Sequence, residues 1–246
     1  MSITENVARV RAEIEAAAIA AGRDPKSIQL CAATKMNDAE AVREAIRAGV
    51  DCCGENRVQE LTAKLAENAY QGAPVHFIGH LQTNKVKQVV GKVDLIQSVD
   101  SERLLRAIDA EAKKQGIRQN VLLEVNIGEE ASKSGFAAED ILPFLEKCGI
   151  YSNICIKGLM AIPPISQNSG DNVKFFRKMF QLYVDIRRKK GDNVKVDCAP
   201  IIDADCLSMG MSADYADAIA CGSTMIRVGT AIFGARNYAM PPSTLM

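Results

Sequence analysis

The chain has 246 residues and balances 30 Lys and Arg against 30 Asp and Glu, so its formal net charge is zero. This balance argues against binding of nucleic acid by phosphate neutralisation, which requires a basic surplus or a basic face. Hydrophobic residues make up 48%, as in folded proteins, and neither a run of roughly 18 apolar residues nor a signal peptide is present, so a cytoplasmic protein without a membrane span is expected.

Short β-branched runs recur along the chain, and a segment of helical periodicity follows most of them. This alternation is typical of βα units that build a parallel sheet. Strands are predicted at 27–35, 50–56, 74–80, 94–100, 120–126, 154–162, 205–210 and 224–234. Helices are predicted at 3–21, 38–48, 57–68, 83–91, 101–115, 137–148, 172–189 and 212–221, with Asp38, Asp100 and Ser212 as capping residues. The segment 162–172, rich in Pro, Ser and Asn, is expected to be a surface loop.

Eight strands with helices between them fit an α/β fold in which one domain, 1–246, forms a closed (β/α)₈ TIM barrel. No helix is predicted after the last strand, and the extra N-terminal helix is expected to complete the outer ring instead. The alternative is an open, doubly wound sheet. That alternative is disfavoured because no G-x-G-x-x-G motif follows the first strand.

Functional residues of such a barrel lie at the C-terminal ends of its strands. Lys35 ends the first predicted strand, where partial burial favours the neutral amine that attacks a carbonyl. An ordinary solvated lysine at a strand end is the alternative interpretation.

The last strand carries an interior arginine, Arg227, followed by Gly229 and Thr230. Backbone N–H groups at such a glycine turn can form an anion cradle with the neighbouring hydroxyl, and barrels commonly bind phosphate after strands seven and eight. Ser208, at the end of the seventh strand, would converge on the same side of the mouth. The alternative is a glycine that permits a tight turn and an arginine paired with a carboxylate.

Other polar residues give weaker signals. His80 is either a catalytic residue or a hydrogen-bonding residue at a helix entry, and Met209 is expected to be apolar lining. The eight cysteines show no C-x-x-C spacing and are expected to be buried, reduced thiols. No metal site is expected, because His76 and His80 would stand about 13 Å apart on one strand.

Seven segments together resemble the pyridoxal-phosphate homeostasis proteins, single-barrel relatives of the N-terminal domain of alanine racemases. The segments, in chain order, are AATK (32–35), GENRVQE (54–60), HFIGHLQTNK (76–85), SKSGF (132–136), GLMAIPP (158–164), LSMGMSADY (207–215) and GSTMIRVGTAIFGAR (222–236). The resemblance covers nearly the whole chain. It implies that the protein binds pyridoxal 5′-phosphate (PLP).

The resemblance also implies roles for individual residues. Lys35 would hold PLP as an internal aldimine, and Arg227 would face the pyridine nitrogen. Asn56 would lie near the ring, with His80 and Met209 lining the pocket. The phosphate would be bound by Ser208, Gly229 and Thr230.

The resemblance and this chemistry favour a cofactor-holding protein over an enzyme. A protonated arginine donates to the pyridine nitrogen and weakens the ring as an electron sink. The racemases take a second base from a further domain, which is not expected in a chain ending at Met246. We therefore expect a monomer that serves PLP homeostasis with little or no turnover and delivers PLP to apo PLP-dependent enzymes. A PLP-dependent enzyme such as a weak amino-acid racemase, with His80 as second base, is the alternative, and a barrel for another phosphate ligand is a third.

Overall fold

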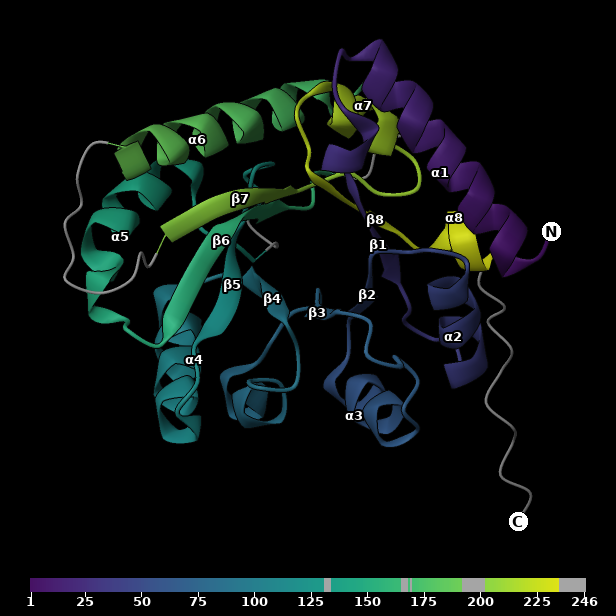
Figure 1. Cartoon of the computed structure of the whole chain (residues 1–246). Coiled ribbons are helices and arrows are strands. Elements are labelled where there is room, and N and C mark those ends of the chain that lie inside the picture. Colours follow the sequence, from purple (N-terminus) through teal and green to yellow (C-terminus); the bar gives the residue numbers. More distant parts are fainter. Residues whose placement is uncertain (131–133, 165–167, 169, 192–201, 235–246) are drawn as a thin grey trace.

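A closed barrel of eight parallel strands forms the centre of the molecule (Figure 1). The computed structural model describes the chain except residues 131–133, 165–167, 169, 192–201 and 235–246, and the side chains of 189–191. Cys198 and part of the predicted loop 162–172 therefore lie outside the described residues. The strands follow one another around the barrel in chain order, with β8 closing on β1. The predicted (β/α)₈ TIM barrel is confirmed.

The strands are β1 (Gln29–Ala33), β2 (Cys52–Glu55), β3 (Val75–Phe77), β4 (Leu95–Val99), β5 (Gln119–Val125), β6 (Ile154–Ala161), β7 (Ile202–Ser208) and β8 (Met225–Val228). The α-helices are α1 (Ile3–Ala20), α2 (Ala39–Arg47), α3 (Val58–Ala66), α4 (Glu102–Gln115), α5 (Ile141–Lys147), α6 (Val173–Gly191), α7 (Tyr215–Ala220) and α8 (Thr230–Phe233). The 3₁₀ segments are η1 (Pro25–Ser27), η2 (Thr83–Gln88), η3 (Ala138–Asp140) and η4 (Cys148–Ile150). Among the described helices, none is both long and apolar enough to cross a bilayer.

The N-terminal helix completes the outer ring, as predicted. Ser2 and Glu5 form a capping box at its start, which satisfies backbone N–H groups that the helix leaves unpaired. Four apolar side chains at helical spacing, Val7, Val10, Ile14 and Ala18, are buried on one face. This face packs beside α7 and α8 (Figure 1).

Two predicted elements are wrong. The last strand ends at Val228 and not at 234, and a short helix, α8, follows it after Gly229. The strand stops because β1 pairs with it only from Gln29 to Ala32, so residues beyond Val228 have no neighbouring strand and bond locally, Phe233 N to Gly229 O. The predicted helix 83–91 is the 3₁₀ segment η2.

Apolar side chains form two separate cores. The larger one lies between the strands and the outer helices, and it includes Phe77, Ile96 and Phe176. The smaller one contains Cys31, Cys52, Leu95, Leu122, Met160, Cys206 and Met225. Residues of one strand alternate between the two, since Cys52 belongs to the smaller core and Cys53 to the larger. The smaller core therefore fills the inside of the barrel.

Candidate functional site

The C-terminal ends of β2, β3, β5 and β6 surround a cavity of about 330 Å³ at the barrel mouth. Its lining residues are Asn56, Ile78, Gly79, His80, Glu124, Val125, Asn126, Ser134 and Ile162. The ends of β2 and β3 approach closely because Gly79 has no side chain, as a Cβ there would lie 2.1 Å from the carbonyl oxygen of Asn56. The structure thus brings together two of the predicted site residues, Asn56 and His80.

Lys35 lies in the turn after β1 and not on the strand itself, and its side chain is half-buried. A buried ion pair supports this turn. Lys64 Nζ, on α3, lies 2.5 Å from Glu55 Oε1 at the end of β2 and donates to the carbonyl oxygen of Thr34 at 2.7 Å. The Thr34 hydroxyl donates to the same Glu55 carboxylate. The residue before Lys35 is therefore fixed through both its backbone and its side chain.

The residue after Lys35 is fixed as well. Met36 has φ 62°, a left-handed conformation that non-glycine residues seldom adopt. Its N–H donates to Glu60 Oε2 on α3 at 2.7 Å, and Asn37 Nδ2 donates to the carbonyl oxygen of Lys35 at 3.0 Å. These contacts orient the turn, so that the backbone carrying Lys35 is held on both sides.

Arg227 lies inside the barrel, where its guanidinium is buried. Nη2 donates to the carbonyl oxygen of Ala161 at 2.9 Å, and Nη1 donates to Ser208 Oγ at 2.5 Å. Burial lowers the pKa of Arg227, yet arginine stays protonated in proteins. The hydroxyl of Ser208 donates in turn to Gln97 Oε1 at 2.7 Å. Ser208 therefore positions the arginine, and the only donor proton of its hydroxyl is used by Gln97.

Three of the predicted site residues, Ser208, Met209 and Arg227, are buried and do not line the cavity at the mouth. Ser208 is fully buried, and its hydrogen bonds to Gln97 and Arg227 leave the hydroxyl no free donor for a phosphate. Met209 follows an inward-facing residue, so it points outward by strand alternation and is buried in the larger core. These contacts do not support the expected roles of Ser208 as a phosphate ligand and of Met209 as pocket lining, and both roles stay predictions.

Another serine lies beside the predicted glycine turn. Ser212 Oγ accepts a hydrogen bond from the N–H of Ala231 at 3.4 Å, within the first turn of α8. Gly229 precedes that helix and Thr230 begins it, so the first N–H groups have no partner within the helix. Gly229 also lies against Ala33, two residues before Lys35, since a Cβ on the glycine would be 3.5 Å from that of Ala33. The structure therefore places Ser212, Gly229 and Thr230 near the Lys35 turn.

Two residues predicted as helix caps have different contacts. Asp38 does cap α2, accepting from Ala41 N at 2.8 Å. Asp214 occupies the cap position of α7 instead of Ser212, and Ser101 caps α4 instead of Asp100. These two predictions are wrong because each helix begins later along the chain than the periodicity indicated. Ser212 instead contacts α8, and Asp100 contacts His80.

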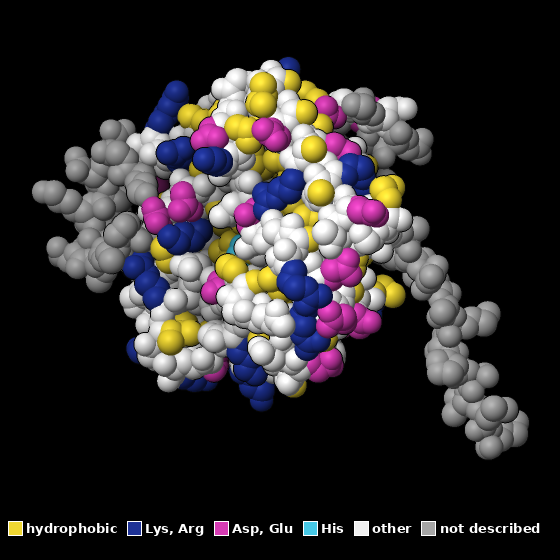
Figure 2. Space-filling view, turned by 45° about the vertical axis from the view of Figure 1, so that its right-hand side comes forward, with side chains coloured by type: hydrophobic (Ala, Val, Ile, Leu, Met, Phe, Trp, Pro, Cys, Tyr) yellow, Lys and Arg dark blue, Asp and Glu magenta, His cyan; other side chains and the backbone are white. Residues whose placement is uncertain are grey.

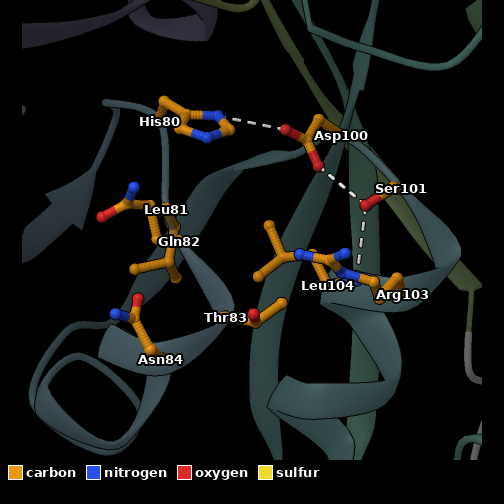
Figure 3. Close-up of a pocket in the computed structure, with 9 residues that line it drawn as sticks. All are labelled: His80, Leu81, Gln82, Thr83, Asn84, Asp100, Ser101, Arg103 and Leu104. Carbon is orange, nitrogen blue, oxygen red and sulfur yellow. Dashed lines mark hydrogen bonds and ion pairs between the residues drawn. The ribbon is translucent and has the colours of Figure 1, made fainter.

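His80 belongs to the rim of the mouth and is exposed. Its Nδ1 lies 3.1 Å from Asp100 Oδ2, and Asp100 also accepts from the Ser101 hydroxyl at 2.9 Å (Figure 3). The histidine also borders a second cavity of about 420 Å³ between η2 and α4, lined among others by Gln82, Thr83 and Arg103. The imidazole thus stands between two cavities, oriented by an acidic partner.

Glu124 is a further ionisable residue of the mouth, and it was missed at the sequence level. It lines the cavity with Asn56 and His80. Burial, reinforced by the negative charge of Asp100, raises its pKa to about 7, against the lowering effects of Arg227 and His80. An acidic residue within the apolar run of a buried strand is itself unusual, and this signal in NVLLEVN could have identified it. Glu124 can therefore exchange a proton near neutral pH.

Replacing Glu124 with glutamine is expected to remove a pH-dependent loss of stability. Because the folded protein holds this proton up to about pH 7, the free energy of unfolding falls between about pH 4.5 and 7, and the full penalty applies above that range. Urea unfolding at pH 8 should show the variant more stable by up to about 3 kcal/mol, with a smaller difference at pH 5. The exposed Glu139→Gln is the control. Equal pH profiles for the wild type and Glu124→Gln would contradict the assignment.

Charges of both signs are interspersed on the face shown in Figure 2, where Lys and Arg lie beside Asp and Glu. A small area of histidine is visible in a hollow near the middle of this face. The described surface in this view therefore has no extended patch of one sign.

Comparison with known proteins identifies the class of the barrel. The sequence profile of the alanine racemase N-terminal domain family matches residues 3–237. A solved alanine racemase from Clostridium difficile shares the fold, with 14% sequence identity and a TM-score of 0.66, over 98% of this chain and 58% of the racemase chain. The fold and its mouth thus define a barrel of the alanine racemase N-terminal class.

Relatives of similar length are more specific. The pyridoxal phosphate homeostasis protein of Pseudomonas aeruginosa is 40% identical over 244 residues, which cover 98% of this chain and 99% of that protein. The structure of PipY from Synechococcus elongatus with PLP bound has a TM-score of 0.78 at 32% identity, covering 95% of this chain and 100% of PipY. The chain belongs to the pyridoxal phosphate homeostasis protein family.

Proposed function

We propose that the protein binds PLP at the barrel mouth and acts in the homeostasis of this cofactor. The amine of Lys35 forms a Schiff base with the PLP aldehyde, Arg227 donates to the pyridine nitrogen, and Asn56 and His80 border the ring. The phosphate is held by Gly229 and Thr230, with Ser212 in the place first expected for Ser208. The observation that carries this proposal is the convergence of the Lys35 turn with Gly229 and Ser212 at one end of the barrel.

The residues of the mouth fit this group. Asn56 Oδ1 is buried and has no hydrogen-bond partner among the described residues, although it borders the cavity. Such an atom costs free energy unless a ligand or water satisfies it. The phenolic hydroxyl and aldehyde of PLP provide hydrogen-bonding groups, its phosphate suits free N–H groups and a hydroxyl, and its pyridine nitrogen suits a buried guanidinium.

Little or no catalytic turnover is part of the proposal. PLP acts in catalysis as an electron sink for carbanions, and a protonated pyridine nitrogen strengthens that sink. Arg227 remains protonated and can only donate to this nitrogen, which therefore stays unprotonated. The buried contacts of Arg227 with Ser208 and Ala161 keep it in this orientation. The names of the curated relatives agree with a homeostatic role.

Delivery of PLP to apo PLP-dependent enzymes is proposed as the physiological outcome, by a monomer in the cytoplasm. The seven described cysteines are free, as is usual for proteins of a reducing compartment. The test mixes PLP-loaded protein with an apo-enzyme in the presence of a trap for free PLP. Recovery of enzyme activity despite the trap would support direct delivery. Recovery that disappears with the trap would contradict it, because the apo-enzyme would then be using released PLP.

Ser212→Ala is expected to weaken PLP binding by about tenfold or more, because a hydrogen bond to a charged group contributes about 1.5–3 kcal/mol. Competition by inorganic phosphate against PLP should weaken in parallel. Ser27→Ala, whose hydroxyl bonds Asp24 near the start of β1, is the control and should bind PLP normally. If Ser208→Ala lost phosphate competition while Ser212→Ala kept it, Ser208 would be the phosphate ligand after all.

A PLP-dependent enzyme, such as a weak amino-acid racemase, is the second candidate, and Glu124 is the observation that favours it. A carboxyl group with a pKa of about 7 beside the PLP cavity can accept or donate a proton at neutral pH. Deuterium exchange at Cα of amino acids tests this function. Protein-dependent exchange that disappears in Glu124→Gln or His80→Ala would favour the enzyme, and its absence would favour the homeostatic role.

A further inference from the structure

A cluster of sulfur and nitrogen donors lies inside the barrel, deeper than the mouth. Cys31 of β1, Cys52 of β2 and His76 of β3 come from three consecutive strands, and all three are buried. Their potential ligand atoms, two Sγ and one imidazole nitrogen, all lie within 4.8 Å of one another. Cys31 and Cys52 are direct partners in the parallel pairing of β1 and β2, which brings their side chains to the same face.

Most side chains around the cluster are apolar or soft, and the polar amide of Gln97 contacts His76. Cys31 and Cys52 belong to the smaller core, where the side chains of Leu95, Leu122, Met160, Cys206 and Met225 are the other members. Within the described part of the chain, no carboxylate belongs to the group of donors. A hard cation that needs carboxylate ligands would therefore find none among these donors, whereas thiolates and imidazole suit soft ions.

The imidazole is oriented with a nitrogen toward this cluster. His76 Nδ1 lies 3.5 Å from Cys52 Sγ and 2.9 Å from Gln97 Nε2. An amide nitrogen can only donate, so Nδ1 carries the lone pair in this arrangement, which is the form that binds a metal. Gln97 Nε2 is also 3.1 Å from Met225 Sδ, and its Oε1 accepts from Ser208, so the amide keeps other partners if the metal takes this lone pair.

One distance within the cluster is close to that between two ligands of one ion. With the bond lengths known for zinc, about 2.3 Å to sulfur and 2.0–2.1 Å to nitrogen, Sγ and N would stand about 3.6 Å apart at tetrahedral angles and about 3.8 Å apart at the angles of a three-coordinate ion. The observed separation of Cys52 Sγ and His76 Nδ1 is 3.5 Å. We propose that Cys31, Cys52 and His76 form a closed site for a thiophilic metal ion, and that this ion is monovalent copper.

Copper is favoured over zinc by the number and kind of donors. Structural zinc is almost always held by four ligands. The cluster has three, and the thioether of Met225 belongs to the same core. Monovalent copper is selected by thiolate and thioether ligands and accepts three of them. The site uses none of the residues proposed to bind PLP and does not depend on that function.

The test refolds the full chain anaerobically with Cu⁺ buffered by the chromophoric chelator bicinchoninate, and measures the copper retained. The wild type should retain one equivalent, and Cys31→Ser and Cys52→Ser should lose it. Cys53→Ser is the matched control, because Cys53 is adjacent in sequence and buried but belongs to the larger core. Circular dichroism shows whether each variant folds.

X-ray absorption on the copper-loaded wild type keeps the test decisive if a variant fails to fold. Two sulfur ligands and one nitrogen ligand are expected. Absence of copper uptake, equal uptake by folded Cys31→Ser, or a spectrum without nitrogen would overturn the site. If the wild type retained Zn²⁺ but not Cu⁺, and Cys31→Ser and Cys52→Ser lost the Zn²⁺, the assignment to copper would be overturned.

Discussion

Replacing Lys64 with methionine is expected to lower the free energy of unfolding by about 3–5 kcal/mol, because it leaves a buried carboxylate without its counter-ion. Glu55 is fully buried, and Lys64 Nζ at 2.5 Å is its cationic partner. The loss would also release the carbonyl oxygen of Thr34, which Lys64 binds beside Lys35. Urea unfolding monitored by circular dichroism measures the change.

The double variant Glu55→Gln, Lys64→Met separates the ion pair from the packing of the lysine stem. It removes the charge that the single variant leaves unpaired, so more than half of the lost stability should return. Lys113→Met on the exposed face of α4 is the control and should change stability by no more than about 0.5 kcal/mol. A double variant as unstable as Lys64→Met would show that packing, and not the unpaired carboxylate, causes the loss.

Lys35→Ala is expected to abolish the visible absorbance that appears when the wild-type protein is mixed with PLP. The absorbance arises from the bond between a lysine amine and the PLP aldehyde, and alanine supplies no amine. Lys92→Ala, which removes an exposed lysine that is not part of the proposed site, is the control and should retain this absorbance. Since the Lys35 turn is fixed by contacts of Thr34 and Met36, removal of the lysine side chain should leave the fold intact.

Most of the barrel was predictable because each strand is a short apolar run between segments of helical periodicity. The end of β8 was not, since TAIFG is apolar and suits either a strand or a helix. The end of β8 is set by its partner β1, which pairs with it only as far as Ala32. The weak periodicity of 83–91 likewise did not distinguish a 3₁₀ segment from an α-helix.

The site was predictable where a residue's role depends on its place at a strand end. Lys35, Asn56, His80, Gly229 and Thr230 lie at these ends, although their roles toward PLP stay predictions. The choice between Ser208 and Ser212 was not predictable, because it depends on where β7 leaves the barrel. The chain turns at Gly210, with φ 94°, so the second serine and not the first reaches α8.

Contacts between strands were the least accessible to sequence reasoning. The grouping of Cys31, Cys52 and His76 depends on the register of β1, β2 and β3, which no local pattern in the sequence specifies. The expectation of no metal site considered spacing along the chain, of the cysteines and of the two histidines, and not pairing between strands. Met209 could have been placed correctly, because alternation from an inward Ser208 sends it outward.

The most direct test of PLP binding through Lys35 is borohydride reduction of the PLP-loaded wild-type protein, followed by protease digestion and mass spectrometry. Reduction makes a Schiff base permanent, so the modified lysine can be located. The account predicts a pyridoxyl group on the peptide that contains Lys35 and on no other lysine. A protein that carries no label, or one labelled elsewhere with Lys35 unmodified, would contradict it.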